Sequence, residues 1–357
     1  MAKRAGVVAV AGLILAACAV WWEPSTPVEV EKVEVRSAPD AADLAPTLEL
    51  PGPVHERVDF WMQHFVTQDR RTFEEFLSRE SIYGDVIREK LRAREMPEDL
   101  LYLAMIESGF STLATSRTQA SGLWQFMGPT AREYGLDVSE FVDERRDPLK
   151  ATDAALDYLE RLHDRFGSWY LAAAAYNAGP TRVARAVRAA GDSELEDHEV
   201  FWDIVDHLPP ETRAYVSRLL AAVLLAKEAE EYGFHVEGPK PYEFERVWVP
   251  GETSLQRVAE AVDQPLSVLR DLNPHLIRDR TPPGTSYGIR VPPGKAPRVV
   301  ASLGNVWVLA DDRSSALTGA PGEGGAPGPA PSIRVPAADT PEDPSFGRLP
   351  GSRVPTP

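Results

Sequence analysis

One glutamate within an apolar stretch has the surroundings that acid catalysis requires. If the run after Pro97 is a helix, Leu100, Leu103 and Glu107 lie on one face, because they are spaced i, i+3 and i+7. Gly109 would end this helix and leave Glu107 in its last turn. Burial and the negative end of the helix dipole both disfavour a carboxylate anion, so the pKa of Glu107 should rise. Such a group could donate a proton at neutral pH.

The same pattern also fits a buried partner of an arginine. A glutamate on an apolar helix face is often paired in this way, and the local spacing does not separate the two interpretations. Residues elsewhere in the sequence are needed to distinguish the two interpretations.

The elements that would position Glu107 are helical. Apolar residues repeat with a helical period from residue 54 to 91, and further helices are expected at about 129–134, 151–166, 172–179 and 211–232. No segment of this region alternates as a strand would. We therefore expect a mainly α domain over residues 53–238, with its core at 95–235.

Four motifs occur in order along this helical region: ESGF at 107–110, GLWQF at 122–126, AYNAG at 175–179 and LPPETRAYV at 208–216. Together they resemble the soluble lytic transglycosylase domain, and they are most similar to the membrane-bound lytic murein transglycosylase D group. The resemblance implies a lysozyme-like fold. It also implies cleavage of the β-1,4 bond between N-acetylmuramic acid and N-acetylglucosamine in peptidoglycan.

By this resemblance, Glu107 is the only acid and base. It would protonate the bridging oxygen and then accept the proton of the C6 hydroxyl, which closes a 1,6-anhydro ring. The resemblance places Ser116 and Gln125 along the cleft, Tyr176 and Asn177 at the N-acetyl group, and Tyr215 near the glutamate. Trp124 stands where the wider family more often has methionine.

One carboxylate suffices for this chemistry if the substrate assists. Most glycosidases need two carboxylates to manage an oxocarbenium-like state. An N-acetyl oxygen that reaches the anomeric carbon can replace the second one, provided that neutral groups orient the sugar and exclude water. Two alternatives remain open. One is a hydrolytic, goose-lysozyme-like muramidase using Glu133, Asp137 or Asp143, and the other is a non-catalytic peptidoglycan-binding lipoprotein.

The periodicity changes after Lys240. Strands at 244–249 and 287–291 frame helices at 254–262 and 266–272, which predicts a small βααβ unit within residues 240–295. This unit resembles a LysM module, a binder of N-acetylglucosamine chains, with Gly251, Thr253, Leu255, Asn273 and Pro274 in its pattern. Residues 298–309 could add a strand, and the tail at 312–357 has the Pro, Gly, Ala and Ser content of disordered chains.

The N-terminus predicts export and lipid anchoring. Lys3 and Arg4 precede an apolar run that ends in LAAC, which resembles a bacterial lipobox. The resemblance implies a lipoprotein signal at 1–17, lipidation of Cys18 and a tether at 18–52. In the Gram-negative families that this motif resembles, Ala19 after the cysteine implies the outer membrane, facing the periplasm. We expect a monomer attached to the membrane by its lipid.

Composition excludes several classes of function. A net charge of −16 argues against nucleic-acid binding, and any attraction to an acidic polymer would have to be local. The seven histidines show no ligand spacing, so we expect no metal and no cofactor.

Overall fold

The computed structural model describes residues 48, 56–191, 199–235, 242–284 and 286–303. Its α-helices are α1 (Glu56–Thr67), α2 (Arg70–Ala93), α3 (Leu101–Ser108), α4 (Gly128–Glu133), α5 (Pro148–Phe166), α6 (Trp169–Ala178), α7 (Pro180–Ala190), α8 (Glu199–Ile204), α9 (Pro210–Lys227), α10 (Leu255–Val262), α11 (Leu266–Leu272) and α12 (Ala296–Leu303). The strands are β1 (Glu245–Val249) and β2 (Tyr287–Val291), and 3-10 turns lie at Glu98–Leu100, Glu144–Arg146 and Val205–His207.

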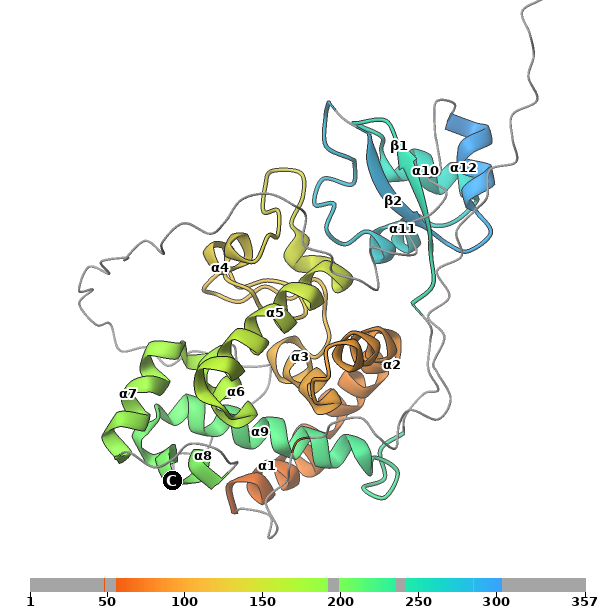
Figure 1. Cartoon of the computed structure of the whole chain (residues 1–357). Coiled ribbons are helices and arrows are strands. Elements are labelled where there is room, and N and C mark those ends of the chain that lie inside the picture. The colour runs from red at the N-terminus through yellow and green to blue at the C-terminus, as the bar shows by residue number, and fades with distance from the viewer. Residues whose placement is uncertain (1–47, 49–55, 192–198, 236–241, 285, 304–357) are drawn as a thin grey trace, which may run out of the picture.

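Helices α1 to α9 form one helical body around a shared apolar core (Figure 1). The long helix α9 packs against α1, α3 and α6, and α5 packs against α2 and α6. The alanines of α6 let its neighbours approach closely, and Ala172 to Ala175 are fully buried. The short helix α3 is thereby enclosed, with its C-terminal turn directed toward α9. The predicted mainly α, lysozyme-like class is confirmed.

The second unit is a compact βααβ module with a core of its own. Strands β1 and β2 are antiparallel, with Glu245 opposite Val291 and Val249 opposite Tyr287. Helices α10 and α11 lie between them in the sequence, as the pattern predicts. The expected extra strand at 298–309 is wrong over its described part, because Ala296–Leu303 is helix α12. Its Ala296 and Val299 are buried in the module core, which the spacing i, i+3 of a helix allows.

The module is docked on the helical body through a buried polar contact. Asp147 caps α5 by accepting from the amides of Leu149 and Lys150. Both of its carboxylate oxygens, Oδ1 and Oδ2, also accept from Nη2 of Arg290 on β2, at 2.8 and 2.6 Å. Burial by itself would raise the pKa of Asp147, but the charge and hydrogen bonds of Arg290 hold it well below its usual range. Burial also lowers the pKa of His275 to about 4, so its imidazole is neutral at physiological pH.

Backbone pairing and apolar contacts extend this interface. Val142 and Leu276 form an antiparallel bridge, and the amide of Asp143 donates to the carbonyl of His275 at 2.9 Å. An apolar cluster joins Val86 of α2 to Tyr242 and Phe244 of the module. The two units therefore share a packed boundary (Figure 1).

Two sets of predictions lie outside the described residues: the signal at 1–17 with Cys18 and nearly all of the tether, and the tail at 312–357. Among the helices that are described, none combines the length and the apolar character that a bilayer crossing requires.

Candidate active site

Helix α3 places a glutamate in its last turn. The helix is almost entirely apolar, and the residues from Leu101 to Met105 are buried. It ends at Gly109, whose φ of 58° is left-handed, and a Cβ at this position would lie 2.1 Å from the Phe76 ring. Only glycine fits this turn. The sequence-based position of Glu107 is therefore the one that the structure has.

The carboxyl group of Glu107 is held by one neutral donor. Tyr215 of α9 donates its hydroxyl to Glu107 Oε1 at 2.8 Å. Although the residue retains some surface exposure, its carboxyl group is closely surrounded, and burial raises its pKa to about 7. The Tyr215 hydrogen bond and the charge of Arg218 oppose this shift, and Glu211 adds to it. Desolvation is the dominant effect, so the group is poised between acid and base at neutral pH.

The arginine interpretation of Glu107 is not supported. Arg218 acts on Glu107 through its charge, yet none of the ion pairs between described residues joins the two side chains. Arg218 lies over the ring of Trp61, 5.3 Å from its centroid, and burial lowers its pKa. The glutamate thus has an arginine nearby without a salt bridge that would fix it as an anion.

Tyr176 of the AYNAG motif lies near this carboxyl group, and the next residue, Asn177, contacts α9. The charge of Glu107 contributes to raising the pKa of Tyr176 well above its usual value, after the larger effect of burial. The Tyr176 hydroxyl donates to the carbonyl of Trp124 at 2.8 Å, and Asn177 Oδ1 accepts from Thr212 of α9 at 3.0 Å. These bonds leave the amide nitrogen of Asn177 without a protein acceptor among the described contacts. It could donate to a ligand.

The GLWQF loop packs directly against the backbone at Arg145. Gly122 has a φ of 83°, and a Cβ there would meet the carbonyl oxygen of Arg145 at 1.7 Å. Trp124 is fully buried and donates to Thr152 at 3.0 Å, so it belongs to the core. The Gln125 amide donates to the carbonyls of Ala114 and Gly122 at 3.2 and 2.8 Å, which braces the loop.

Ser116 closes a turn of the same loop. It accepts from the amide of Ala120 at 3.0 Å and shares a hydrogen bond with Thr118. The contacts of the described residues include none between Ser116 and Glu107. The cleft roles assigned to Ser116 and Gln125 by resemblance stay predictions.

Three residues near the carboxyl group were not anticipated from the sequence. Ser108 donates to the Leu123 carbonyl at 2.8 Å and so fixes the end of α3 to the GLWQF loop. Glu211 and Arg218 flank Tyr215 on α9 at spacings of four and three residues, which places all three on one face. A polar stripe of this kind on a largely apolar helix is the sequence pattern from which Glu211 and Arg218 could have been predicted.

The alternative second carboxylates are engaged elsewhere. Asp143 is bound by Arg145 at 2.8 Å, and Glu133 pairs with Arg161 at 2.9 Å. Asp137 accepts from Ser139 at 3.3 Å. None of the three is among the charges that shift the pKa of Glu107. No group of His, Cys, Asp or Glu suited to a metal ion occurs within the residues that the structure places.

Two family patterns match this chain. Residues 85–198 match the transglycosylase SLT domain, and residues 243–306 match the LysM-like domain of lytic transglycosylase MltD. The chain thus combines an SLT domain with a LysM-like domain of the MltD type, and the resemblance expected from the four motifs is confirmed. A similar curated protein is membrane-bound lytic murein transglycosylase D of Escherichia coli K12. It is 31% identical over 244 residues, which are 66% of this chain and 52% of that protein.

The chain therefore spans about half the length of the curated relatives it matches. Among solved structures, the 70 kDa soluble lytic transglycosylase Slt70 of Escherichia coli is 27% identical. The match covers 42% of this chain and 24% of that one, with a TM-score of 0.36. An inactive E503Q mutant of lytic transglycosylase Slt from Pseudomonas aeruginosa is 24% identical, covering 41% and 24%, with a TM-score of 0.34. The domain assignment rests on the two family matches.

Proposed function

We propose that this protein is a lytic transglycosylase that cleaves the β-1,4 bond from N-acetylmuramic acid to N-acetylglucosamine in peptidoglycan and leaves 1,6-anhydro ends. The observation that carries this proposal is the Glu107 carboxyl group, whose pKa of about 7 arises from burial and whose hydrogen-bond donor is the neutral Tyr215. The SLT and LysM-like matches agree with it.

In the proposed mechanism, protonated Glu107 gives its proton to the bridging oxygen as the glycosidic bond breaks. The N-acetyl oxygen of the substrate bonds to the anomeric carbon as the leaving sugar departs. The Tyr215 hydroxyl, 2.8 Å from Oε1, stabilises the glutamate anion formed in this step. Glu107 then takes the proton of the C6 hydroxyl, whose oxygen displaces the N-acetyl oxygen and closes the anhydro ring. One carboxyl group serves as acid and base, and its proton is restored.

Neutral polar groups would hold the sugar. The amide nitrogen of Asn177, which has no acceptor among the described residues, could donate to the N-acetyl carbonyl of the substrate. Tyr176 lies near Glu107 and would border the bound N-acetyl group. We assign Gln125 and Ser116 to the wall of the cleft. A second anion at these positions would repel the glutamate anion during turnover.

Mass spectrometry of digested sacculi tests the reaction. Anhydro products are lighter by one water than the reducing-end products of a muramidase. We expect anhydro ends, and a digest containing only reducing ends would assign the chain to the hydrolytic class. Binding to sacculi without any cleavage would support the non-catalytic alternative.

Activity should fall as the pH rises through the pKa of Glu107. The reactive form is the protonated acid, and its pKa is raised to about 7. Above this pH the protonated fraction, and with it kcat/KM, should fall about tenfold per pH unit. Initial rates of anhydro-product release between pH 5 and 9 measure this fall, which is the alkaline limb of the pH profile. A rate that stays constant to pH 9 would show that Glu107 is not the titrating acid.

Replacing Tyr215 by phenylalanine should separate two effects of its hydroxyl. The hydrogen bond lowers the pKa of Glu107, so Y215F should move the alkaline limb to higher pH. The same variant should reduce kcat about 10- to 100-fold, because the anion formed on proton transfer loses its donor. S217A is the control: it removes a hydroxyl two residues further along α9, whose bond among the described residues goes to the Arg213 carbonyl. If the alkaline limb of the Y215F variant lies at the same pH as in the wild type, or at a lower pH, the Tyr215 hydroxyl does not have this role.

We further propose that the LysM-like module binds N-acetylglucosamine chains. A hollow of about 330 Å³ on its surface is lined by residues 250–254 together with Arg257 and Leu303. Asn273 does not contribute to such binding, because it is buried and ties the end of α11 to the backbone of Arg290. Anchoring through Cys18 at the outer membrane, facing the periplasm, and a monomeric state complete the proposal.

A further inference from the structure

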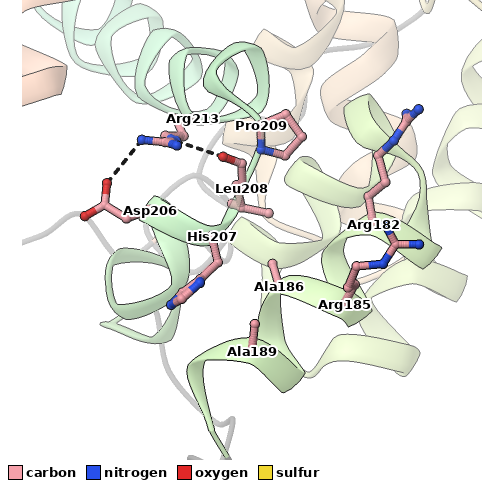
Figure 2. Close-up of a pocket in the computed structure, with 9 residues that line it drawn as sticks. All are labelled: Arg182, Arg185, Ala186, Ala189, Asp206, His207, Leu208, Pro209 and Arg213. Carbon is pink, nitrogen blue, oxygen red and sulfur yellow. Dashed lines mark hydrogen bonds and ion pairs between the residues drawn. The ribbon is translucent and has the colours of Figure 1, made fainter. Parts of the chain in front are cut away.

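A second hollow lies beside the start of α9, on the helical body. Its volume is about 420 Å³, and Glu107 is not among its lining residues. Arginines 182 and 185 of α7 line one side, and Arg213 of α9 lies across from them (Figure 2). The remaining wall consists of Ala186, Ala189, Asp206, His207, Leu208 and Pro209. The hollow is basic in a chain whose net charge is −16.

The charged groups of this hollow differ in how many hydrogen bonds and ion pairs they already make. Arg213 donates to the Leu208 carbonyl at 2.8 Å and pairs with Asp206 at 3.3 Å. Asp206 is also paired with Arg57 at 3.3 Å, so the one carboxylate of the lining is already neutralised. Arg182 makes one bond, to the Ala178 carbonyl at 3.0 Å, and the described contacts give Arg185 no acceptor. Two exposed arginines with unused donors therefore lie along the edge of the hollow.

The hollow borders the proposed cleft through the first turn of α9. Pro209 and Arg213 lie on the hollow side of this turn, whereas Thr212 and Tyr215 face Asn177 and Glu107. Arg182 binds the carbonyl of Ala178, the residue after Asn177. Burial raises the pKa of Glu211 on the same turn, and the charges of Arg182 and Arg218 oppose this shift. The hollow and the carboxyl site therefore lie on opposite sides of the same turn of α9.

We propose that this hollow binds a carboxylate of the peptide stem that the muramyl residue of the strand carries. The inference rests on the proposed function. The N-acetylated sugars of the intact strand are uncharged, whereas the stems end in carboxylates, which guanidinium groups bind well. The volume accommodates several residues of a peptide, and the alanine, leucine and proline side chains offer it an apolar wall.

The test compares stem-bearing glycan strands with strands stripped of their stems by an amidase, in which each muramyl residue carries only its own lactyl carboxylate close to the sugar ring. For the full chain, kcat/KM is measured on both substrates, and the ratio between them reports stem recognition. We expect R182Q/R185Q to lower this ratio about tenfold. R188Q removes an exposed arginine of the same helix that does not line the hollow, and its ratio should equal that of the wild type.

A ratio unchanged in R182Q/R185Q would overturn the proposal, and so would an equal fall in R188Q, since that would reflect the general field of α7. Titration of the isolated stem peptide into the E107Q protein provides a second measurement that needs no turnover. Binding weakened about tenfold by R182Q/R185Q supports the site, and equal binding refutes it. Wild-type protein that forms no anhydro ends from either strand would refute the proposed function alone, because the peptide titration still reports on the hollow.

Discussion

Glutamine in place of Glu107 is expected to abolish the release of anhydro-muropeptides from sacculi, with a loss of about 10³-fold or more. The substitution keeps the size and shape of the side chain but removes the proton that would move to the bridging oxygen. It also removes the base that would accept the C6 proton. Because one carboxyl group performs both steps, the substitution removes both of them together. Quantifying anhydro ends by mass spectrometry measures the loss.

The E107Q variant should fold and should gain stability at alkaline pH. The pKa of Glu107 is raised in the folded protein, so the folded state binds its proton more tightly than the unfolded state. Stability that depends on this group is therefore present at acidic pH and falls as the pH rises from about 4.5 to about 7. Glutamine does not titrate, so the variant should exceed the wild type by about 1–3 kcal/mol at pH 8 and match it near pH 4.

Two measurements check this pair of expectations. Urea unfolding at pH 4 and pH 8 gives the stability difference, and the S217A variant shows what an unrelated change on α9 does. Anhydro ends persisting in E107Q at more than a few per cent of the wild-type rate would remove Glu107 from the mechanism. A variant less stable than the wild type at pH 8 would show that the carboxylate is favourably bound rather than desolvated.

The sequence allows the position of Glu107 to be predicted because all the determinants are local. Apolar spacing sets the face of α3, and Gly109 sets its end, within ten residues of the glutamate. The βααβ order of the module is likewise predicted by alternation and helical spacing. The charges around Glu107 come from α9, more than 100 residues away, and a pattern on one helix does not say which other helix it faces.

Docking of the module could not be predicted for the same reason. Asp147 is recognisable in the sequence as a helix cap before Pro148, and Arg290 as one residue of an alternating strand. Their contact depends on how two separately patterned units pack. Likewise, Asn273 fits the LysM pattern in the sequence, yet the structure shows it bonded within the module core.

Breaking the buried ion pair between the two units should cause a large loss of stability. R290M leaves the Asp147 carboxylate buried without its bidentate partner, and the expected cost is about 3–5 kcal/mol in the free energy of unfolding. R278A removes an exposed ion pair of 3.2 Å with Glu140 across the same boundary. It should cost less than about 1 kcal/mol, because exposed pairs are screened by water. The comparison isolates burial, since both arginines join the module to the helical body.

The double variant D147N/R290M should recover most of this loss. Asparagine keeps an oxygen that can accept from the amides of Leu149 and Lys150, so the cap of α5 survives without a buried charge. Urea unfolding of the single and double variants measures the recovery. If R290M costs no more than R278A, the buried pair does not hold the module. If the loss persists in the double variant, it arises from the lost contact of the arginine guanidinium with the Phe244 ring, whose centroid lies 5.0 Å from Cζ, rather than from an orphaned charge.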